Sequence, residues 1–143
     1  MLRSRIGDER FLAMLGELRR RYEWKAISTE QFRVLAAEFL PPKSHDPKLE
    51  AFFEQWVYGT GIPSLKLAYK VSGKAPNLTL TGSISQQDVD DDFSAEVPVE
   101  IQFAKRKQIT WVETANEPAS FSMTISEAPV RVALDPASDI LRK

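Results

Sequence analysis

The sequence contains no cysteine and a single histidine, His45. The lack of cysteine excludes disulfide bonds, thiolate nucleophiles, cysteine-ligated zinc and iron–sulfur clusters. One histidine cannot supply a zinc site, which needs two or three such ligands and a general base. A serine triad is also excluded, because no Gly-x-Ser-x-Gly turn accompanies His45. We therefore expect His45 to be a solvated loop residue.

An excess of one charge and a long apolar run are also lacking. Nineteen Lys and Arg residues against twenty Asp and Glu residues give a net charge of −1, whereas a nucleic-acid-binding surface usually shows a strong basic excess. No apolar run approaches the roughly 18 residues that span a bilayer, and no apolar stretch follows the charged N-terminus as it does in a signal peptide. We expect a soluble protein of the cytoplasm or periplasm that binds no nucleic acid.

The hydrophobic period of the sequence changes once, near Gly59–Pro63, and before that point it is helical. A helix is predicted to begin at Asp8 and to end in a run of arginines, which suit the helix dipole. Its apolar face consists of Phe11, Met14, Leu15, Leu18 and Tyr22. Leu2 and Ile6 fall on the other side of this helical wheel, so we interpret them as the end of an earlier helix that Gly7 interrupts.

Two further helices are predicted between Ser28 and Gly59. Ser28 and Gln31 form the sequence pattern of a capping box, and Pro41 stops the helix that follows. Asp46-Pro47 is predicted to start the third helix, with proline at its first position. This helix carries the broadest apolar face in the chain, formed by Leu49, Phe52, Phe53, Trp56 and Val57.

Apolar and polar residues alternate after Pro63, which is typical of β-strands. Strands are predicted at Leu65–Val71, Leu78–Leu80, Val97–Phe103, Ile109–Trp111, Phe121–Ile125 and Val130–Leu134, and turns at Ser72–Lys74, Lys105–Lys107 and Asn116–Pro118. Six short strands at this spacing favour an antiparallel sandwich. The predicted fold class is therefore α+β, with a three-helix unit over residues 1–61 and a β-sandwich over residues 62–143.

Three patterns resemble ligand sites but lack parts that such sites require. Asp88, Asp90 and Asp92 are spaced like the first ligands of an EF-hand, but the glycine and the final glutamate of that loop are missing. A solvated acidic loop is the simpler interpretation, and another kind of cation site in Asp88–Asp92 remains open. The basic run Lys105–Lys107 is typical of a charged hairpin turn, and the Gly59-x-Gly61 pair does not open a helix as a phosphate loop does.

Several motifs resemble those of the zinc aminopeptidases of the gluzincin type, which include aminopeptidase N, the membrane alanine aminopeptidase, and leukotriene-A hydrolase. Tyr22 followed by Ile27–Phe32 resembles a helix start of that family. Phe52–Val57 followed by Gly61-Ile62-Pro63 resembles its helix-to-strand junction, and Leu134-Asp135-Pro136 resembles its C-terminal ending. The resemblance is close up to residue 71 and looser beyond it.

This resemblance implies a non-catalytic C-terminal fragment of a zinc-dependent enzyme that removes N-terminal residues from peptides. The helices would end a thermolysin-like catalytic domain, and the strands would form an immunoglobulin-like β-sandwich that acts as a spacer. The His-Glu-x-x-His motif, the distal glutamate ligand and the catalytic tyrosine of the family have no counterpart here. Met1 is then an internal methionine, and we expect the chain alone to bind no zinc and to be inactive.

The resemblance gives a role to one set of residues, the helix-to-strand junction. It consists of Phe52, Phe53, Trp56, Gly59, Gly61 and Pro63, and we expect Trp56 to be its core anchor. The expected partner is the remaining catalytic domain, whose absence would leave Leu2, Ile6 and part of the first helix uncovered and available for self-association. The alternative is a free-standing β-sandwich module that binds protein or glycan, which would expose no such apolar patch.

Overall fold

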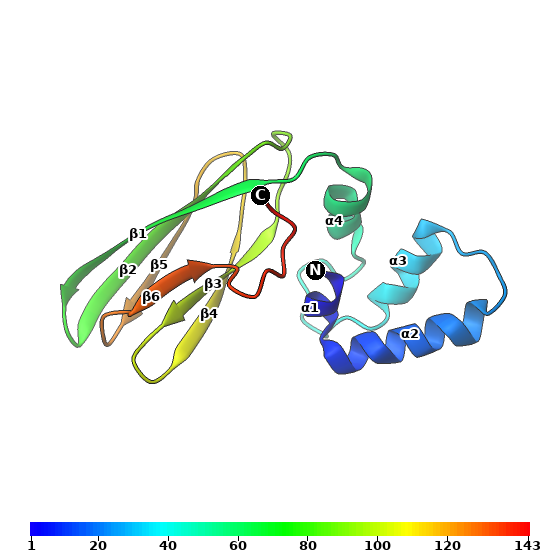
Figure 1. The fold of residues 1–143 in the computed structure, drawn as a ribbon, viewed down its shortest axis with the longest axis horizontal. Coiled ribbons are helices and arrows are strands. Elements are labelled where there is room, and N and C mark those ends of the chain that lie inside the picture. Colours follow the sequence, from blue (N-terminus) through cyan, green and yellow to red (C-terminus); the bar gives the residue numbers. More distant parts are fainter. The chain divides into compact units, whose positions relative to one another are not determined.

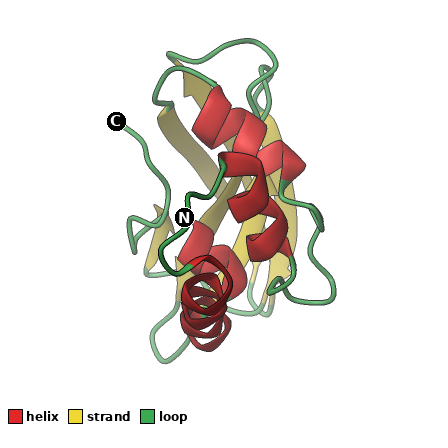
Figure 2. Cartoon of the chain, turned by 90° about the vertical axis from the view of Figure 1, so that its right-hand side faces the viewer, coloured by secondary structure: helices red, strands yellow, loops and turns green.

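A computed structural model describes all residues from Met1 to Lys143 and divides them into two units, Met1–Gly59 and Thr60–Lys143. All helices belong to the first unit and all strands to the second (Figures 1 and 2). The α+β class is therefore confirmed, and the division falls two residues before the predicted one. None of the helices combines the length and the apolar character that crossing a membrane requires.

The helical unit contains α1 (Leu2–Ile6), α2 (Asp8–Tyr22), α3 (Thr29–Ala37), α4 (Glu50–Phe53) and the π-helical turn η1 (Glu54–Tyr58). Gly7 separates α1 from α2 with a φ of 86°, which favours glycine. Across this break Arg3 forms a bidentate ion pair with Asp8, in which Nε and Nη2 of the arginine lie 2.7 and 2.9 Å from the two carboxylate oxygens. The predicted capping box is present, since Gln31 N donates to Ser28 Oγ and Ser28 N donates to Gln31 Oε1.

The third predicted helix starts later than expected. Residues 46–49 form a turn, and Leu49 adopts a left-handed conformation with a φ of 56° directly before α4. The carboxylate of Asp46 accepts a hydrogen bond from Phe52 N at 2.9 Å. The side chain of Asp46 thus stabilises the start of α4, although Asp46 lies six residues before Phe52. The prediction that Pro47 occupies the first helical position was wrong, because α4 begins at Glu50.

One apolar cluster holds the helical unit together. Its buried members are Ile6, Met14, Leu35, Ala36, Leu49, Phe52 and Phe53. Apart from Leu49, which directly precedes α4, they come from α1, α2, α3 and α4, so each α-helix contributes to a single core. Burying one such large side chain stabilises the fold by about 1.5–3 kcal/mol, and a short element such as α1 depends on contacts of this kind because it cannot be stable alone.

The second unit consists of two three-stranded antiparallel sheets. One has the strand order β1-β2-β5 and contains β1 (Ser64–Lys74), β2 (Asn77–Gln87) and β5 (Ala119–Ile125). The other has the order β4-β3-β6 and contains β3 (Glu96–Gln102), β4 (Lys107–Glu113) and β6 (Arg131–Leu134). The sheets approach each other where β1 meets β6 and where β4 meets β5. The chain therefore passes from one sheet to the other after β2, β4 and β5.

The first hairpin is longer than the sequence predicted. Ser72, Gly73 and Lys74 were expected to form its turn, but all three pair with β2, Ser72 with Thr79 and Lys74 with Asn77. The turn lies at Ala75-Pro76 instead. Gly73 lies in the strand with a φ of 93°, so its positive φ marks a twist in the ladder rather than the reversal of the chain.

Alternating residues of the strands form the core of the second unit. Leu78, Leu80 and Ile84 of β2 are buried, and so are Val97, Val99 and Ile101 of β3. Residues of one parity along a strand share one face of the sheet. The remaining buried apolar residues of this unit include Leu65, Phe93, Phe103, Val112, Ile125 and Val132. Each sheet therefore has one buried face and one more polar face.

A buried carboxylate fixes the tail that follows β6. The side chain of Asp135 is fully buried and accepts hydrogen bonds from Asp139 N at 2.8 Å and Ile140 N at 3.1 Å. The guanidinium group of Arg142 lies 3.5 Å from the same carboxylate. Lys143 N then donates to Pro63 O at 3.0 Å. The tail is thus tied back to the residue that precedes β1.

Candidate functional site

Two of the aromatic residues of the predicted junction are core residues of the helical unit. Phe52 and Phe53 are 7% and 3% exposed, and their rings meet edge to face with centroids 5.9 Å apart. The ring of Phe53 also lies 6.3 Å from that of Phe32. On its other side Phe52 contacts the guanidinium carbon of Arg5 at 5.0 Å, a cation–π arrangement.

Trp56 is not the core anchor that the sequence led us to expect. It is partly buried and packs against the edge of the core, whereas Val57 and Tyr58 beside it are nearly half exposed. The reason is the π-helical turn η1, which changes the helical period after Phe53 and moves the residues that follow away from the core. Gly59 N donates a hydrogen bond to Glu54 O at 2.7 Å, which ends this turn. A Cβ on Gly59 would lie only 2.8 Å from Gln55 O, so the close approach requires glycine.

The last two junction residues begin the second unit. Gly61 has a φ of 94°, and a Cβ there would lie 2.8 Å from Asp88 O. Pro63 is fully buried at the start of β1, where its carbonyl accepts the hydrogen bond from Lys143 N. Both residues therefore have a structural task, which is to bring the chain closely past the loop after β2 and into the first strand.

His45 and the acidic loop do not form a site with other ligands. His45 is exposed, and Asp88 has a φ of 66° and is paired with Lys143 Nζ at 3.1 Å. In the whole chain no three His, Cys, Asp or Glu side chains are grouped so that they could hold a metal ion. The residues present therefore do not fit the catalytic zinc of the family that the sequence resembles.

Ion pairs join α2 to α3 beside a small groove of about 230 Å³. Arg21 is bound to Glu38 at 2.8 Å and also to Glu17, which raises the pKa of its guanidinium group. Hydrogen bonds from Arg20 and Arg21 lower the pKa of Glu17 from 4.5 to about 2. The charges of this groove therefore neutralise one another, and its role is to hold the two helices together.

A second ionic contact joins α3 to η1. Tyr58 donates its hydroxyl hydrogen to Glu30 Oε1 at 2.7 Å, while Arg33 lies 2.8 Å from the other oxygen of Glu30. The hydrogen bond to Glu30 raises the pKa of Tyr58, and Arg33 is the larger cause of a lowered pKa at Glu30. This contact ties the exposed end of η1 to the helical unit.

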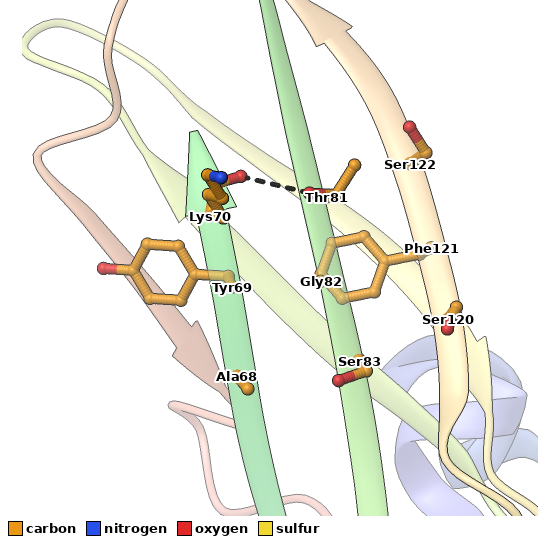
Figure 3. A pocket seen from close by; sticks show the side chains of 9 residues that line it. All are labelled: Ala68, Tyr69, Lys70, Thr81, Gly82, Ser83, Ser120, Phe121 and Ser122. Atoms are coloured by element: carbon orange, nitrogen blue, oxygen red, sulfur yellow. Dashed lines mark hydrogen bonds between the residues drawn. The ribbon is translucent and has the colours of Figure 1, made fainter. Parts of the chain in front are cut away.

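A hollow with a volume of about 630 Å³ lies on the sheet β1-β2-β5 of the second unit. Figure 3 shows its nine lining residues, which are Ala68–Lys70, Thr81–Ser83 and Ser120–Ser122 from three neighbouring strands. Tyr69, Gly82 and Phe121 pair in one row across the sheet, and the ring of Phe121 extends over Gly82 (Figure 3). The absence of a side chain on Gly82 makes room for this ring.

Basic and hydroxyl side chains share the polar face of this sheet. Lys66, Lys70 and Lys74 lie on β1 with the parity opposite to that of buried Leu65. Across the sheet Lys66 pairs with Ser85, Lys70 with Thr81 and Lys74 with Asn77. The same face also carries Ser72 on β1, Thr79 and Ser83 on β2, and Ser120, Ser122 and Thr124 on β5. The sequence analysis missed this surface, although a spacing of four between lysines on a strand places them on one face.

The apolar surface of the helical unit differs from the prediction. Ile6 was expected to be uncovered but is 1% exposed, because α1 folds back and adds it to the core. Leu2 is partly buried against the same core. The exposed apolar residues of this unit include Leu12 and Leu15 of α2, at 63% and 40%, and Trp24, at 98%. Leu15 belongs to the face of the first predicted helix, part of which was expected to be uncovered.

The junction residues position the chain, the ionic groups of the helical unit pair with one another, and the polar face of the first sheet presents unpaired lysines to solvent. No protein-family model matches the chain, and no curated protein has a significantly similar sequence.

Proposed function

We propose that this chain is a non-catalytic part of a zinc-dependent aminopeptidase, in which it supports the catalytic domain and supplies a β-sandwich spacer. The junction carries this proposal. Phe52-Phe53, Trp56, Gly61 and Pro63 occur in the order of the family's motif, and Gly59 lies between them. Except for the partly buried Trp56, each of these residues has a separate physical task in this fold. Two are core aromatics, two are glycines beside nearby carbonyl groups, and the last is a buried proline at the first strand.

The helical unit supports the same proposal through its exposed apolar residues. Leu12 and Leu15 of α2 are 63% and 40% exposed, and Val34 of α3 is 53% exposed. Apolar side chains gathered on one helix are typical of a surface that another domain covers. We infer that a catalytic domain is the partner of this surface and that self-association covers it when that domain is absent.

We also infer that the second unit is an immunoglobulin-like sandwich. In such sandwiches the first, second and fifth strands form one sheet, and the chain crosses repeatedly to the other sheet. The orders β1-β2-β5 and β4-β3-β6 agree with this connectivity.

The chemistry of the proposed enzyme belongs to groups outside this chain. Zinc bound in a catalytic domain would polarise the peptide carbonyl and activate water. The residues described here would hold the wall of that domain in place and would not enter the reaction. We derive no catalytic step from them.

The proposal is tested first with the purified chain, zinc sulfate and an alanyl chromogenic substrate. We expect no turnover and no zinc retained after gel filtration, measured by atomic emission. Turnover, or one zinc bound per chain, would overturn the proposal. Sequencing of the transcript upstream of Met1 then supplies the decisive result. A His-Glu-x-x-His motif in the same reading frame supports the proposal, and a stop codon in that frame contradicts it.

A free-standing module that binds protein or glycan is the second candidate. It is favoured by the two separate units, each of which has a buried core of its own. Sedimentation of the purified chain distinguishes the candidates. A monomer that does not bind an apolar dye supports the module, whereas dimers that dissociate on Leu12→Glu substitution support the fragment.

A further inference from the structure

One face of the sheet β1-β2-β5 carries three lysines and no carboxylate. We call it the lysine face and define it by Lys66, Lys70 and Lys74 on β1 together with the alternate residues of β2 and β5 that point the same way. Those residues are Asn77, Thr79, Thr81, Ser83, Ser85, Gln87, Ser120, Ser122 and Thr124. The face is therefore positive in a protein whose net charge is −1.

The three lysines differ from most cations of the chain because they form no ion pair. Elsewhere basic side chains bind carboxylates, as Lys107 binds Glu100 at 3.2 Å and Lys143 binds Asp88 at 3.1 Å. Lys66, Lys70 and Lys74 have no acidic neighbour on their own face. Their charges are thus directed to solvent and are not neutralised within the protein.

Most hydroxyl groups beside the lysines are also available for hydrogen bonds to a ligand. Within the protein only Thr81 forms a side-chain hydrogen bond on this face, from its Oγ1 to Lys70 O at 3.4 Å (Figure 3). The side chains that neighbour the lysines on this face are mostly small, so they do not cover the charges. Residues of both parities line the hollow of about 630 Å³: Lys70, Thr81 and Ser122 share the parity of the lysine face, whereas Tyr69, Gly82 and Phe121 have the opposite parity.

The spacing of the lysines indicates an extended ligand. Residues four apart on a strand are separated by roughly 13 Å, so the three charges form a straight row along β1. Hydroxyl groups on the two neighbouring strands lie beside this row and both donate and accept hydrogen bonds. A ligand that fits this face carries repeated negative charges and many hydroxyl groups.

We propose that the lysine face binds an acidic polysaccharide, with its anionic groups at Lys66, Lys70 and Lys74 and its sugar hydroxyls over the Ser and Thr residues of β2 and β5. The face has no arginine for bidentate binding of phosphate, which argues against a nucleic acid. The proposal does not depend on the aminopeptidase proposal, because the surface lies wholly within the second unit.

Affinity electrophoresis of the purified chain tests the proposal with four soluble polymers. Polygalacturonate carries carboxylates, heparin carries sulfates, dextran is uncharged, and polyglutamate is an acidic peptide. We expect retardation by at least one of the two acidic polysaccharides, and which of them binds identifies the anionic group. Retardation should fall when the salt is raised from about 0.1 M to about 1 M, because salt screens exposed charges.

Two triple variants with the same change in charge locate the binding surface. Lys66→Ala/Lys70→Ala/Lys74→Ala should weaken binding about tenfold, which corresponds to three exposed ion pairs. The control Lys25→Ala/Lys43→Ala/Lys105→Ala removes three lysines from loops elsewhere and should bind like the parent protein. Circular dichroism and thermal unfolding establish that both variants remain folded, and Ser122→Glu, which adds a carboxylate to the hollow, should also weaken binding.

The proposal is overturned if neither acidic polysaccharide retards the chain, or if dextran does so equally. It is also overturned if polyglutamate binds more tightly than both polysaccharides, since the partner would then be of another class. Equal loss of binding in the two triple variants would show that net charge, and not the lysine face, is responsible.

Discussion

Replacing Asp135 tests how the C-terminal tail is held. The carboxylate of Asp135 has no exposure to solvent, and it accepts two backbone hydrogen bonds and faces Arg142. Asp135→Ala removes all three contacts at once. Asp135→Asn keeps one oxygen and the size of the side chain but loses the charge. Since φ at residue 135 is 43°, asparagine is also the substitute that best tolerates this backbone conformation.

The expected loss of stability follows from the number and burial of these contacts. A hydrogen bond to a charged group contributes about 1.5–3 kcal/mol, but the donors at residues 139 and 140 are only partly buried, so water replaces part of what is lost. We therefore expect Asp135→Ala to lower the free energy of unfolding by about 3 kcal/mol. Asp135→Asn should cost about half of that, and Arg142→Ala, whose side chain is 30% exposed, about 1 kcal/mol or less.

Urea unfolding measures these differences when the fluorescence reports on the second unit alone. Trp111 is the only tryptophan of that unit, so Trp24 and Trp56 are first replaced by phenylalanine. A loss below about 1 kcal/mol for Asp135→Ala would refute the reasoning. Stability of Asp135→Asn equal to that of the parent protein would show that the charge has no part in holding the tail.

Three further predictions concern the two cores and a surface charge. The lowered pKa of Glu17, about 2 against 4.5, means that this ionised carboxylate stabilises the helical unit above about pH 4.5, and that the stabilisation is lost as the pH falls toward 2. Glu17→Gln should therefore reduce the acid-induced loss of helical circular dichroism in that range, and an unchanged profile would contradict this. Phe53→Ala should destabilise the helical unit by about 3–5 kcal/mol and Trp56→Ala by clearly less, in urea unfolding followed by circular dichroism; the reverse order would contradict the described core. Gly82→Ala should lower stability by about 1–2 kcal/mol because its Cβ would overlap the ring of Phe121, and Phe121→Leu should restore part of that loss in thermal unfolding if the overlap is the cause.

Periodicity and capping residues were sufficient to predict most of the elements. The alternation in Val97–Phe103 predicted β3, and the pattern of Ser28 and Gln31 predicted the start of α3 within one residue. These signals are local, so no knowledge of distant contacts was needed. The late start of α4 was not predictable in this way, because it depends on the left-handed conformation of Leu49 and on a hydrogen bond from Phe52 to Asp46.

The candidate surfaces were harder to predict than the elements. Trp56 belongs to the predicted apolar face, but the π-helical turn shifts the period by one residue and moves it to the edge of the core. Ile6 was expected to be exposed because it falls on the other side of the helical wheel, where an absent domain would sit. Its burial depends on the packing of α1 into the core that also contains Met14. The lysine face needed the pairing of β1, β2 and β5, since strands far apart in the sequence supply its hydroxyl groups.

The hydrogen bond between Lys143 N and Pro63 O has a consequence for engineering. It brings the entry and the exit of the second unit within 3.0 Å of each other. A unit whose ends meet can be inserted into a surface loop of another protein without stretching either connection. For the same reason, a short linker could join residue 143 to residue 60 while new termini are opened at the exposed turn Lys105–Arg106, giving a circular permutant with the same strand pairing.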